Sequence, residues 1–131
     1  MNILKSIGIE FDKVPLTLTL SEKNQNHVKT IHAGALFILA ESASGAYLSS
    51  LFPELKDKVI PLLRGSNIKY KKGAMGVISS HVKLKDDEKE RFQKQFSKKS
   101  RATIEVKVTL KNESDEIVAE GTFNWYVQQL V

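Results

Sequence analysis

The sequence predicts an α+β fold in which an antiparallel β-sheet wraps around one long central α-helix. Three observations indicate this fold class. Residues 30–52 form a helix-length segment rich in Ala, Ser and Gly, and Glu41 is its only acidic or basic residue apart from a histidine. Segments of alternating apolar and polar residues flank it, as half-buried strands do. A sheet with one apolar face needs a cover, and this helix is long enough to provide it.

Length and composition predict a single domain spanning residues 1–131. The chain is 41% apolar and 27% charged, which is ordinary for a soluble globular protein. It has no cysteine, so it has no disulfide framework, thiolate metal site or cysteine nucleophile, and we expect a cytoplasmic location. The first eight residues lack the pattern of a signal peptide. Glu41, His32 and several serines argue against residues 30–52 as a membrane span.

The net charge of +5 and the isoelectric point near 9.4 favour anionic partners. These would be nucleic acid, acidic membranes or the phosphates of a nucleotide-bearing substrate. Most lysines are scattered or alternate with acidic residues, which favours a solvated surface instead. We therefore expect neither a nucleic-acid partner nor a membrane partner.

The first strand is expected over residues 14–20, with Leu16, Leu18 and Leu20 on one face. A polar loop over residues 21–26 follows. The helix is expected over residues 33–50 and is ended by Pro53. Helical spacing predicts that one face packs on the sheet, made of Leu36, Phe37, Ala40, Ala43, Tyr47 and Leu51.

Four more extended segments follow the helix. Residues 59–63 and 66–70 form a stretch interrupted near Gly65, and residues 72–76 form a turn. Residues 77–84 alternate, with Ile78, Val82 and Leu84 facing inward. Residues 104–110 and 117–127 form a hairpin across residues 112–116.

A short amphipathic surface helix is expected over residues 86–99, before the last hairpin. Its acidic residues come first and its lysines last, which suits the helix dipole. Two pairs spaced four residues apart, Asp87 with Arg91 and Glu90 with Lys94, add support. An apolar stripe is formed by Phe92 and Phe96. Its acids offset its bases, so it is a weak nucleic-acid element.

Glu41 is the strongest candidate for chemistry in the chain. Burying a carboxylate without a partner is costly, so an acidic residue in an apolar helix needs a role. The alternative is a structural carboxylate paired with a lysine or histidine. Gly45 is also notable, because glycine inside a helix costs about 1 kcal/mol relative to alanine. It suggests the close approach of another backbone or of a ligand.

The residues around the helix start resemble the motif of the hotdog-fold acyl-CoA thioesterases, of the phenylacetate-pathway and 4-hydroxybenzoyl-CoA type. The likeness rests on Asn26, on His32-Ala33-Gly34 six positions later, and on Glu41 nine residues past the histidine. Residues 68–70 and 73–76 look like the strand and turn that follow the family's helix. The extra helix is similar to that of an uncharacterised thioesterase-like branch. The element order matches over nearly the whole chain, but only the helix start is specific.

This resemblance implies a hotdog fold and hydrolysis of an acyl-CoA or acyl-carrier-protein thioester. It implies no metal or redox cofactor, since coenzyme A is part of the substrate. The amides of Ala33 and Gly34 would bind the thioester oxygen, Glu41 would be general base or nucleophile, and Asn26 would orient water or the thioester. His32 would be a catalytic base or, as we favour, a hydrogen-bonded helix-entry residue. Residues expected to contact substrate are Phe37, Gly45, Tyr70, Lys71 and Lys72.

Two departures from the family pattern leave an alternative open. Ala33 replaces the first glycine of the usual pair, and the usual proline near the turn is Lys72 or is absent. The methyl group of Ala33 would crowd a thioester. A non-catalytic acyl-CoA-binding or regulatory protein is therefore the second hypothesis.

The spacing of the implied residues also predicts an oligomer. Glu41 lies eight residues beyond Ala33, about 12 Å along a helix at roughly 1.5 Å per residue. A carboxylate side chain does not span that distance, so Ala33 of one chain would work with Glu41 of another. We therefore expect a homodimer or a dimer of dimers.

Other chemistries fit the sequence poorly. Ser42 and Ser44 lack the Gly-x-Ser-x-Gly elbow of serine hydrolases. The three histidines, His27, His32 and His81, do not fall at metal-ligand spacings. The paired His and acidic pattern of hotdog dehydratases is not found. Four basic residues are candidates for binding the phosphates of coenzyme A: Arg64, Lys71, Lys72 and Arg101. For each of them, an ordinary surface position is the simpler interpretation.

Overall fold

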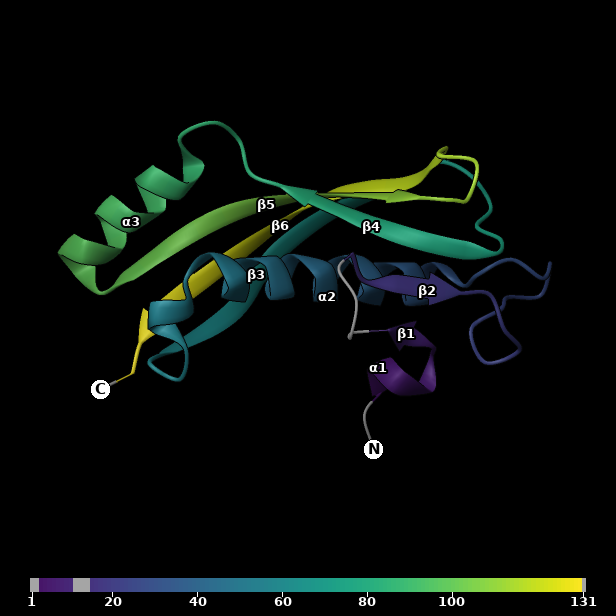
Figure 1. Cartoon of the computed structure of the whole chain (residues 1–131), viewed down its shortest axis with the longest axis horizontal. Helices are drawn as coiled ribbons and strands as arrows, with labels where there is room; N and C mark the ends of the chain where they lie inside the picture. Colours follow the sequence, from purple (N-terminus) through teal and green to yellow (C-terminus); the bar gives the residue numbers. More distant parts are fainter. Residues whose placement is uncertain (1–2, 11–14, 131) are drawn as a thin grey trace.

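The computed structural model describes residues 3–10 and 15–130, so Val14 of the first expected strand lies outside the described residues. Six antiparallel strands form one sheet in the order β1-β2-β4-β5-β6-β3, which curves around helix α2 (Ala33–Leu51) (Figure 1). The strands are β1 (Ile9–Glu10), β2 (Thr17–Thr19), β3 (Val59–Tyr70), β4 (Val77–Lys83), β5 (Arg101–Lys111) and β6 (Ile117–Gln129). The shorter helices are α1 (Ile3–Ser6), the 3₁₀ helix η1 (Pro53–Leu55) and α3 (Glu88–Lys99). This confirms the predicted α+β class and hotdog fold, including the extra helix before the last hairpin.

Helix α2 buries a broader and slightly rotated face than its sequence predicts. Phe37, Tyr47 and Leu51 were expected to pack on the sheet but are only half-buried. The curved sheet covers the helix on more than one side, so burial does not follow a single narrow stripe. Small side chains let the strands approach closely. The buried residues of α2 are Ala35, Leu36, Leu39, Ala40, Ala43, Ser44 and Leu48.

Strand β3 is continuous and lies at one edge of the sheet. The interruption expected near Gly65 is a shift in register against β6, between Leu63 and Gly65. Among the described residues, its outer edge pairs with no other strand. The apolar side chains of Ile60 and Leu62 are 47% and 53% exposed along it. A long strand edge with exposed apolar groups is a ready template for pairing with another chain.

Helix α3 is anchored to β5 by a mostly buried carboxylate. One Glu88 oxygen accepts the backbone N–H of Glu105 at 2.8 Å, and the other accepts Nε of Arg91 at 2.8 Å. The expected Asp87–Arg91 pair is therefore wrong. Asp87 is instead the residue before the helix, with a left-handed φ of 67°. The expected pair of Glu90 with Lys94 is confirmed at 3.4 Å.

Replacing Glu88 with glutamine is expected to lower the free energy of unfolding by about 1–2 kcal/mol at pH 7. This is the low end of the usual worth of hydrogen bonds to a charged group, because the Arg91 side chain is half-exposed and solvent screens the pair. The hydrogen bond from Arg91 holds the pKa of Glu88 below its ordinary value of 4.5. The stabilisation is therefore complete above pH 4.5 and is lost as the pH falls through the lower folded value. Urea titrations at pH 7 and pH 3 measure this. Glu90→Gln, on the exposed side of α3, should change stability little, and a pH-independent loss in Glu88→Gln would contradict the ionic role.

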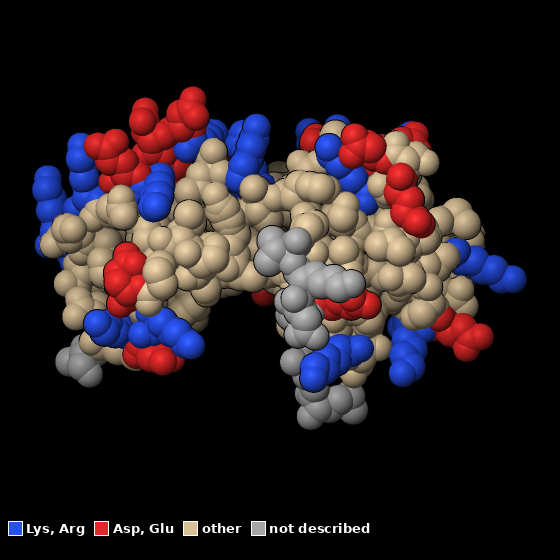
Figure 2. All heavy atoms as spheres, viewed as in Figure 1, with Lys and Arg blue, Asp and Glu red and all other residues tan. Residues whose placement is uncertain are grey.

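The surface carries charges of both signs. On the face shown in Figure 2, lysine and arginine side chains are interleaved with acidic ones, over α3 as well as over the opposite end of the molecule. No helix in the described part of the chain combines the length and the apolar character that a membrane crossing needs.

Candidate active site

The N-terminal end of α2 is held by a buried residue, Asn24, that no local sequence pattern indicates. Asn24 is 3% exposed, and its backbone carbonyl accepts the N–H of His32 at 2.7 Å. Its side-chain oxygen accepts the N–H of Ser21, and its amide nitrogen donates to the carbonyls of Ile7 and Thr19, each at 2.8 Å. A buried amide with its hydrogen bonds made is a strong local clamp. Asn24 thus ties β2 and Ile7, the residue that follows α1, to the helix start.

His32 caps helix α2. Its Nδ1 accepts the backbone N–H of Gly34 at 2.8 Å, and its carbonyl accepts the N–H groups of Ala35 and Leu36. A Cβ at position 34 would lie 3.1 Å from that Nδ1, so glycine leaves room for the cap. This is the hydrogen-bonded helix-entry position favoured for His32. Within the described residues, Ala33 is the remaining N–H of this first turn, and it has no partner.

The free amide of Ala33 defines what this end of the helix can bind. Ala33 is exposed, and its N–H lies at the positive end of a 19-residue helix. An anionic oxygen is well placed at such a group. The N–H of Gly34 was also expected to take part, but it is already bonded to His32. Of the donors that the described residues place at the helix start, the N–H of Ala33 is thus left unpaired.

Asn26 organises the loop that leads into the helix. Its side-chain oxygen accepts the N–H groups of Val28 and Thr30 at 3.0 Å each. Its amide nitrogen donates to the hydroxyl of Thr30 at 2.8 Å. The loop includes Lys29 in a left-handed conformation, which these bonds stabilise. One amide hydrogen of Asn26 is left for a water molecule or a ligand.

Glu41 lies two helical turns beyond Ala33 and is half-buried. In the part of the chain that the structure describes, its carboxylate forms no ion pair and no hydrogen bond. A purely structural role would require a lysine or histidine partner, and no described residue supplies one. A half-buried carboxylate without a partner is available to a water molecule or a substrate.

A buried hydrogen-bonded chain joins the backbone of Glu41 to the sheet. The hydroxyl of Ser44 is fully buried, donates to the carbonyl of Glu41 at 2.7 Å and accepts Nε1 of Trp125 at 2.9 Å. The indole lies beside Gly45, where a Cβ would meet the ring carbon Cζ2 at 3.4 Å. The group that lies close to Gly45 is thus a side chain, that of Trp125 of β6, where the sequence suggested another backbone or a ligand. Ser44 and Trp125 are 81 residues apart, so local sequence patterns do not link them.

Replacing Ser44 with alanine is expected to lower the free energy of unfolding by about 1–2 kcal/mol, because the buried indole N–H loses its acceptor. The fluorescence of Trp125, the only tryptophan of the chain, should change at the same time. Chemical denaturation followed by fluorescence measures both effects. Ser42→Ala is the matched control, since it makes the same change two residues away on α2, at a serine that is not fully buried. Equal stability of the two variants would contradict the clamp.

The turn after β3 lies beside the helix start. The N–H of Ile31 donates to the carbonyl of Ala74 at 2.9 Å, and a Cβ at Gly73 would lie 3.1 Å from the methyl group of Thr30. This contact brings the segment from Tyr70 onward to the same end of the molecule as Ala33. Gly45 lies about 18 Å further along the helix, at roughly 1.5 Å per residue.

The residues expected to contact substrate occupy different environments. Lys71 pairs with Glu120 at 2.8 Å and Lys72 pairs with Glu116, and all four side chains are largely exposed. The hydrogen bond from Lys71 lowers the pKa of Glu120, and the bond from Lys72 lowers that of Glu116. Tyr70 is 45% exposed at the end of β3. Phe37 is half-buried, with its ring centroid 5.6 Å from that of Phe123. Among the residues described, no three His, Asp or Glu side chains are grouped so as to hold a metal ion.

The chain is similar in fold to several solved structures, and some of these proteins are named as thioesterases. A protein of unknown function from Chlorobaculum tepidum is 19% identical, with a TM-score of 0.84 over 98% of this chain and 86% of the other. A Bacillus halodurans protein in complex with CoA is 21% identical, with a TM-score of 0.71 over 91% and 70%. A glutamine-to-alanine mutant of a thioesterase enzyme from Staphylococcus aureus is 17% identical, with a TM-score of 0.70 over 98% and 99%.

The chain itself belongs to the family described as domain of unknown function DUF4442, whose model matches residues 5–127. No curated protein matches the chain. The structural relatives are less than 25% identical to it, so they establish the shared fold.

Proposed function

We propose that this protein is a thioesterase that hydrolyses an acyl-CoA or acyl-carrier-protein thioester. The observation that carries the proposal is a pair of unsatisfied groups on one helix. The N–H of Ala33 has no partner at the positive end of α2, and the half-buried carboxylate of Glu41 has no partner among the described residues. Thioester hydrolysis needs one donor for a developing oxyanion and one base for water, and these two groups have those properties.

The proposed reaction divides the work between these two groups. The N–H of Ala33 donates to the carbonyl oxygen of the thioester as negative charge develops there. Glu41 accepts a proton from water, and the resulting hydroxide attacks the carbonyl carbon. The carbon–sulfur bond then breaks, and the protonated Glu41 returns its proton to the departing thiolate. The alternative, attack by Glu41 itself, would pass through an anhydride that water opens.

The two groups act together only if they come from different subunits. Within one chain they are about 12 Å apart along the helix, at roughly 1.5 Å per residue. The free edge of β3, with its exposed Ile60 and Leu62, is the surface we propose for pairing. A two-fold axis between two antiparallel β3 edges would place both α2 helices on one side of a continuous sheet, running in opposite directions. The start of one helix would then approach the middle of the other.

Features of the structural relatives agree with this proposal. Two Staphylococcus aureus structures carry alanine substitutions, one at a glutamine and the other at a glutamate. Those positions are 15 residues apart, which is also the separation of Asn26 and Glu41. The Bacillus halodurans protein binds CoA. In our proposal, Lys71 and Lys72 exchange their carboxylate partners for the phosphates of coenzyme A.

A thiol-release assay with a panel of acyl-CoA substrates tests the proposal, together with a mass measurement in solution. We expect release of free thiol by a dimer or a larger even-numbered assembly. Saturable binding of acyl-CoA without turnover would contradict the enzyme hypothesis. It would favour the second hypothesis, a non-catalytic acyl-CoA-binding protein, which Ala33 and the missing proline suggest. A purely monomeric active protein would contradict the shared site.

A further inference from the structure

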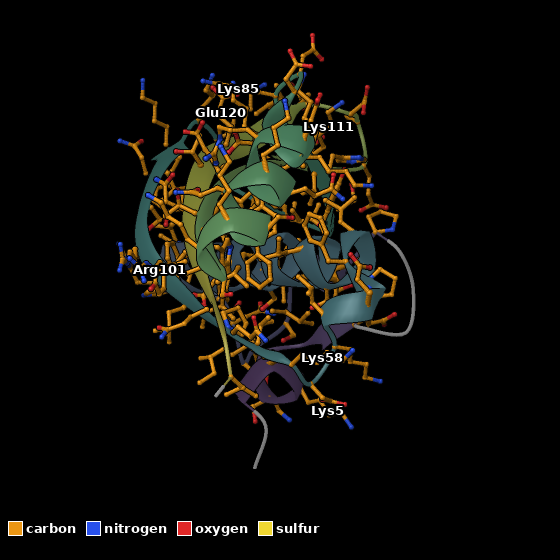
Figure 3. All side chains as sticks on the ribbon, turned by 90° about the vertical axis from the view of Figure 1, so that its left-hand side faces the viewer. Lys5, Lys58, Lys85, Arg101, Lys111 and Glu120 are labelled. Carbon is orange, nitrogen blue, oxygen red and sulfur yellow. The ribbon has the colours of Figure 1, made fainter. Side chains whose placement is uncertain are left out.

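A cavity of about 550 Å³ lies at the C-terminal half of α2, between this helix, η1, the sheet and α3. Figure 3 views the molecule from this end, with α3 in front of the sheet and Lys58 and Arg101 marking the nearby starts of β3 and β5. A volume of this size falls within the usual range of ligand sites, about 300–1,000 Å³. The walls include Gly45, Leu48, Phe52, Phe92, Trp125 and Val127.

The cavity continues the face of α2 that carries Glu41. Gly45, Leu48 and Phe52 lie four, seven and eleven residues beyond Glu41, which places all of them on one side of the helix. The cavity therefore begins about one turn, or roughly 6 Å along the helix axis, beyond position 41. Gly45 has no side chain to close this approach. The ring of Trp125 lies 3.4 Å from the place of a Cβ at that position, so a larger side chain there would press on the indole and narrow the cavity.

The interior of the cavity is apolar and its polar groups lie at the rim. Leu48, Phe52, Phe92 and Val127 are buried, and Phe92 comes from α3, so the extra helix closes one wall. Its ring packs against that of Phe52, with the centroids 4.8 Å apart and the planes tilted by 34°. The indole N–H of Trp125 is already bonded to Ser44 and is not offered to a ligand. The polar residues of the lining are exposed at the rim: Ser49, Lys56 and Asp57.

We propose that this cavity holds the hydrocarbon tail of the substrate, so that the substrate class is a medium-to-long unbranched acyl thioester. The inference rests on the proposed function, because it places the thioester carbonyl at Glu41 and directs the chain past Gly45. A methylene group is close in size to a water molecule, whose share of liquid volume is about 30 Å³. A cavity of about 550 Å³ is thus the volume of about 18 such groups, and a chain of roughly 10 to 16 carbons fits within it. Its apolar walls exclude acyl groups with charged or hydroxylated tails.

The first test compares chain lengths in two variants of adjacent residues. The parent protein should hydrolyse dodecanoyl-CoA at least about 100-fold more efficiently than butyryl-CoA, since each buried methylene adds to binding. Gly45→Leu should reduce that preference by at least about tenfold. Ala46→Leu, exposed on α2 and outside the cavity lining, should leave it unchanged. A parent that prefers butyryl-CoA, or a Gly45→Leu variant with an unaltered preference, would overturn the inference.

The second test does not depend on catalysis. Trp125 is the only tryptophan of the chain and lines the cavity, so its fluorescence reports on an occupant. A bromine-labelled dodecanoate should quench it saturably in the parent and in Ala46→Leu. In Gly45→Leu the leucine would contact the Trp125 ring itself, so titration calorimetry replaces fluorescence and should find binding at least about tenfold weaker. Saturable quenching without thioester turnover would support the cavity as a site for hydrocarbon chains and would contradict the proposed thioesterase function. Thioester turnover without any quenching would support the thioesterase function and would show that the acyl chain does not bind in this cavity.

Discussion

Replacement of Glu41 with glutamine is expected to lower kcat for thioester hydrolysis at least about a hundredfold, the usual contribution of a general base. Glutamine keeps the size and polarity of the side chain but cannot take a proton from water. Because the carboxylate of Glu41 has no partner among the described residues, folding should be unaffected. Steady-state kinetics with an acyl-CoA substrate, together with a thermal melt, measure both consequences.

A glutamate outside the site provides the control for this prediction. Glu54 is exposed in η1, and Glu54→Gln should leave both kcat and the melting temperature unchanged. If the Glu41→Gln variant hydrolysed thioesters at the parental rate, Glu41 would have no part in the mechanism. If the variant were inactive because it had unfolded, its thermal melt would show a lower melting temperature. Glu41 would then have a structural role and not a chemical one.

Replacement of Ala33 with proline is expected to lower kcat by about 10²–10³-fold, the usual cost of losing one oxyanion donor. Proline removes only the N–H group of Ala33, which has no partner in the described structure. The backbone accepts proline at this place. Ala33 is the first residue of α2, where proline is favoured, and the φ and ψ of His32, −60° and 137°, suit a residue that precedes proline. Stability should therefore be retained, as measured by chemical denaturation.

Ala33→Gly is the matched variant for this prediction. It keeps the N–H group and removes the methyl group, and it restores the glycine that is usual in the resembled family. We expect activity at least equal to that of the parent. Full activity in a folded Ala33→Pro variant would show that this amide does not stabilise the oxyanion, and the proposed division of labour would be wrong.

The order of the major elements was predictable because each one leaves a local pattern. Alternating strands, the long small-residue helix and the acid-to-lysine helix α3 are all confirmed. The buried face of α2 was harder to predict, because a curved sheet covers it on more than one side. The elements α1 and β1 contain only four and two residues, which is too short for periodicity to be detected.

The candidate site was predictable only where one segment carries it. Glu41 and Ala33 could be selected because an isolated acid and a helix start are visible in a single stretch of sequence. The clamp by Asn24 and the bond between Ser44 and Trp125 depend on segments far apart in the chain. The cavity likewise needs α2, β6 and α3 together, and its shape follows from side-chain packing that no local pattern encodes.

The most direct test of the shared site is to mix two inactive variants, Glu41→Gln and Ala33→Pro, after unfolding and refolding them together in equal amounts. Each mixed dimer would contain one site with both Ala33 and Glu41 intact and one site with neither. Random pairing makes half of the dimers mixed, so we predict recovery of about a quarter of the parental activity for a two-fold symmetric dimer. A mixture as inactive as either variant alone, with mixed dimers present by mass, would show that Ala33 and Glu41 do not meet across subunits.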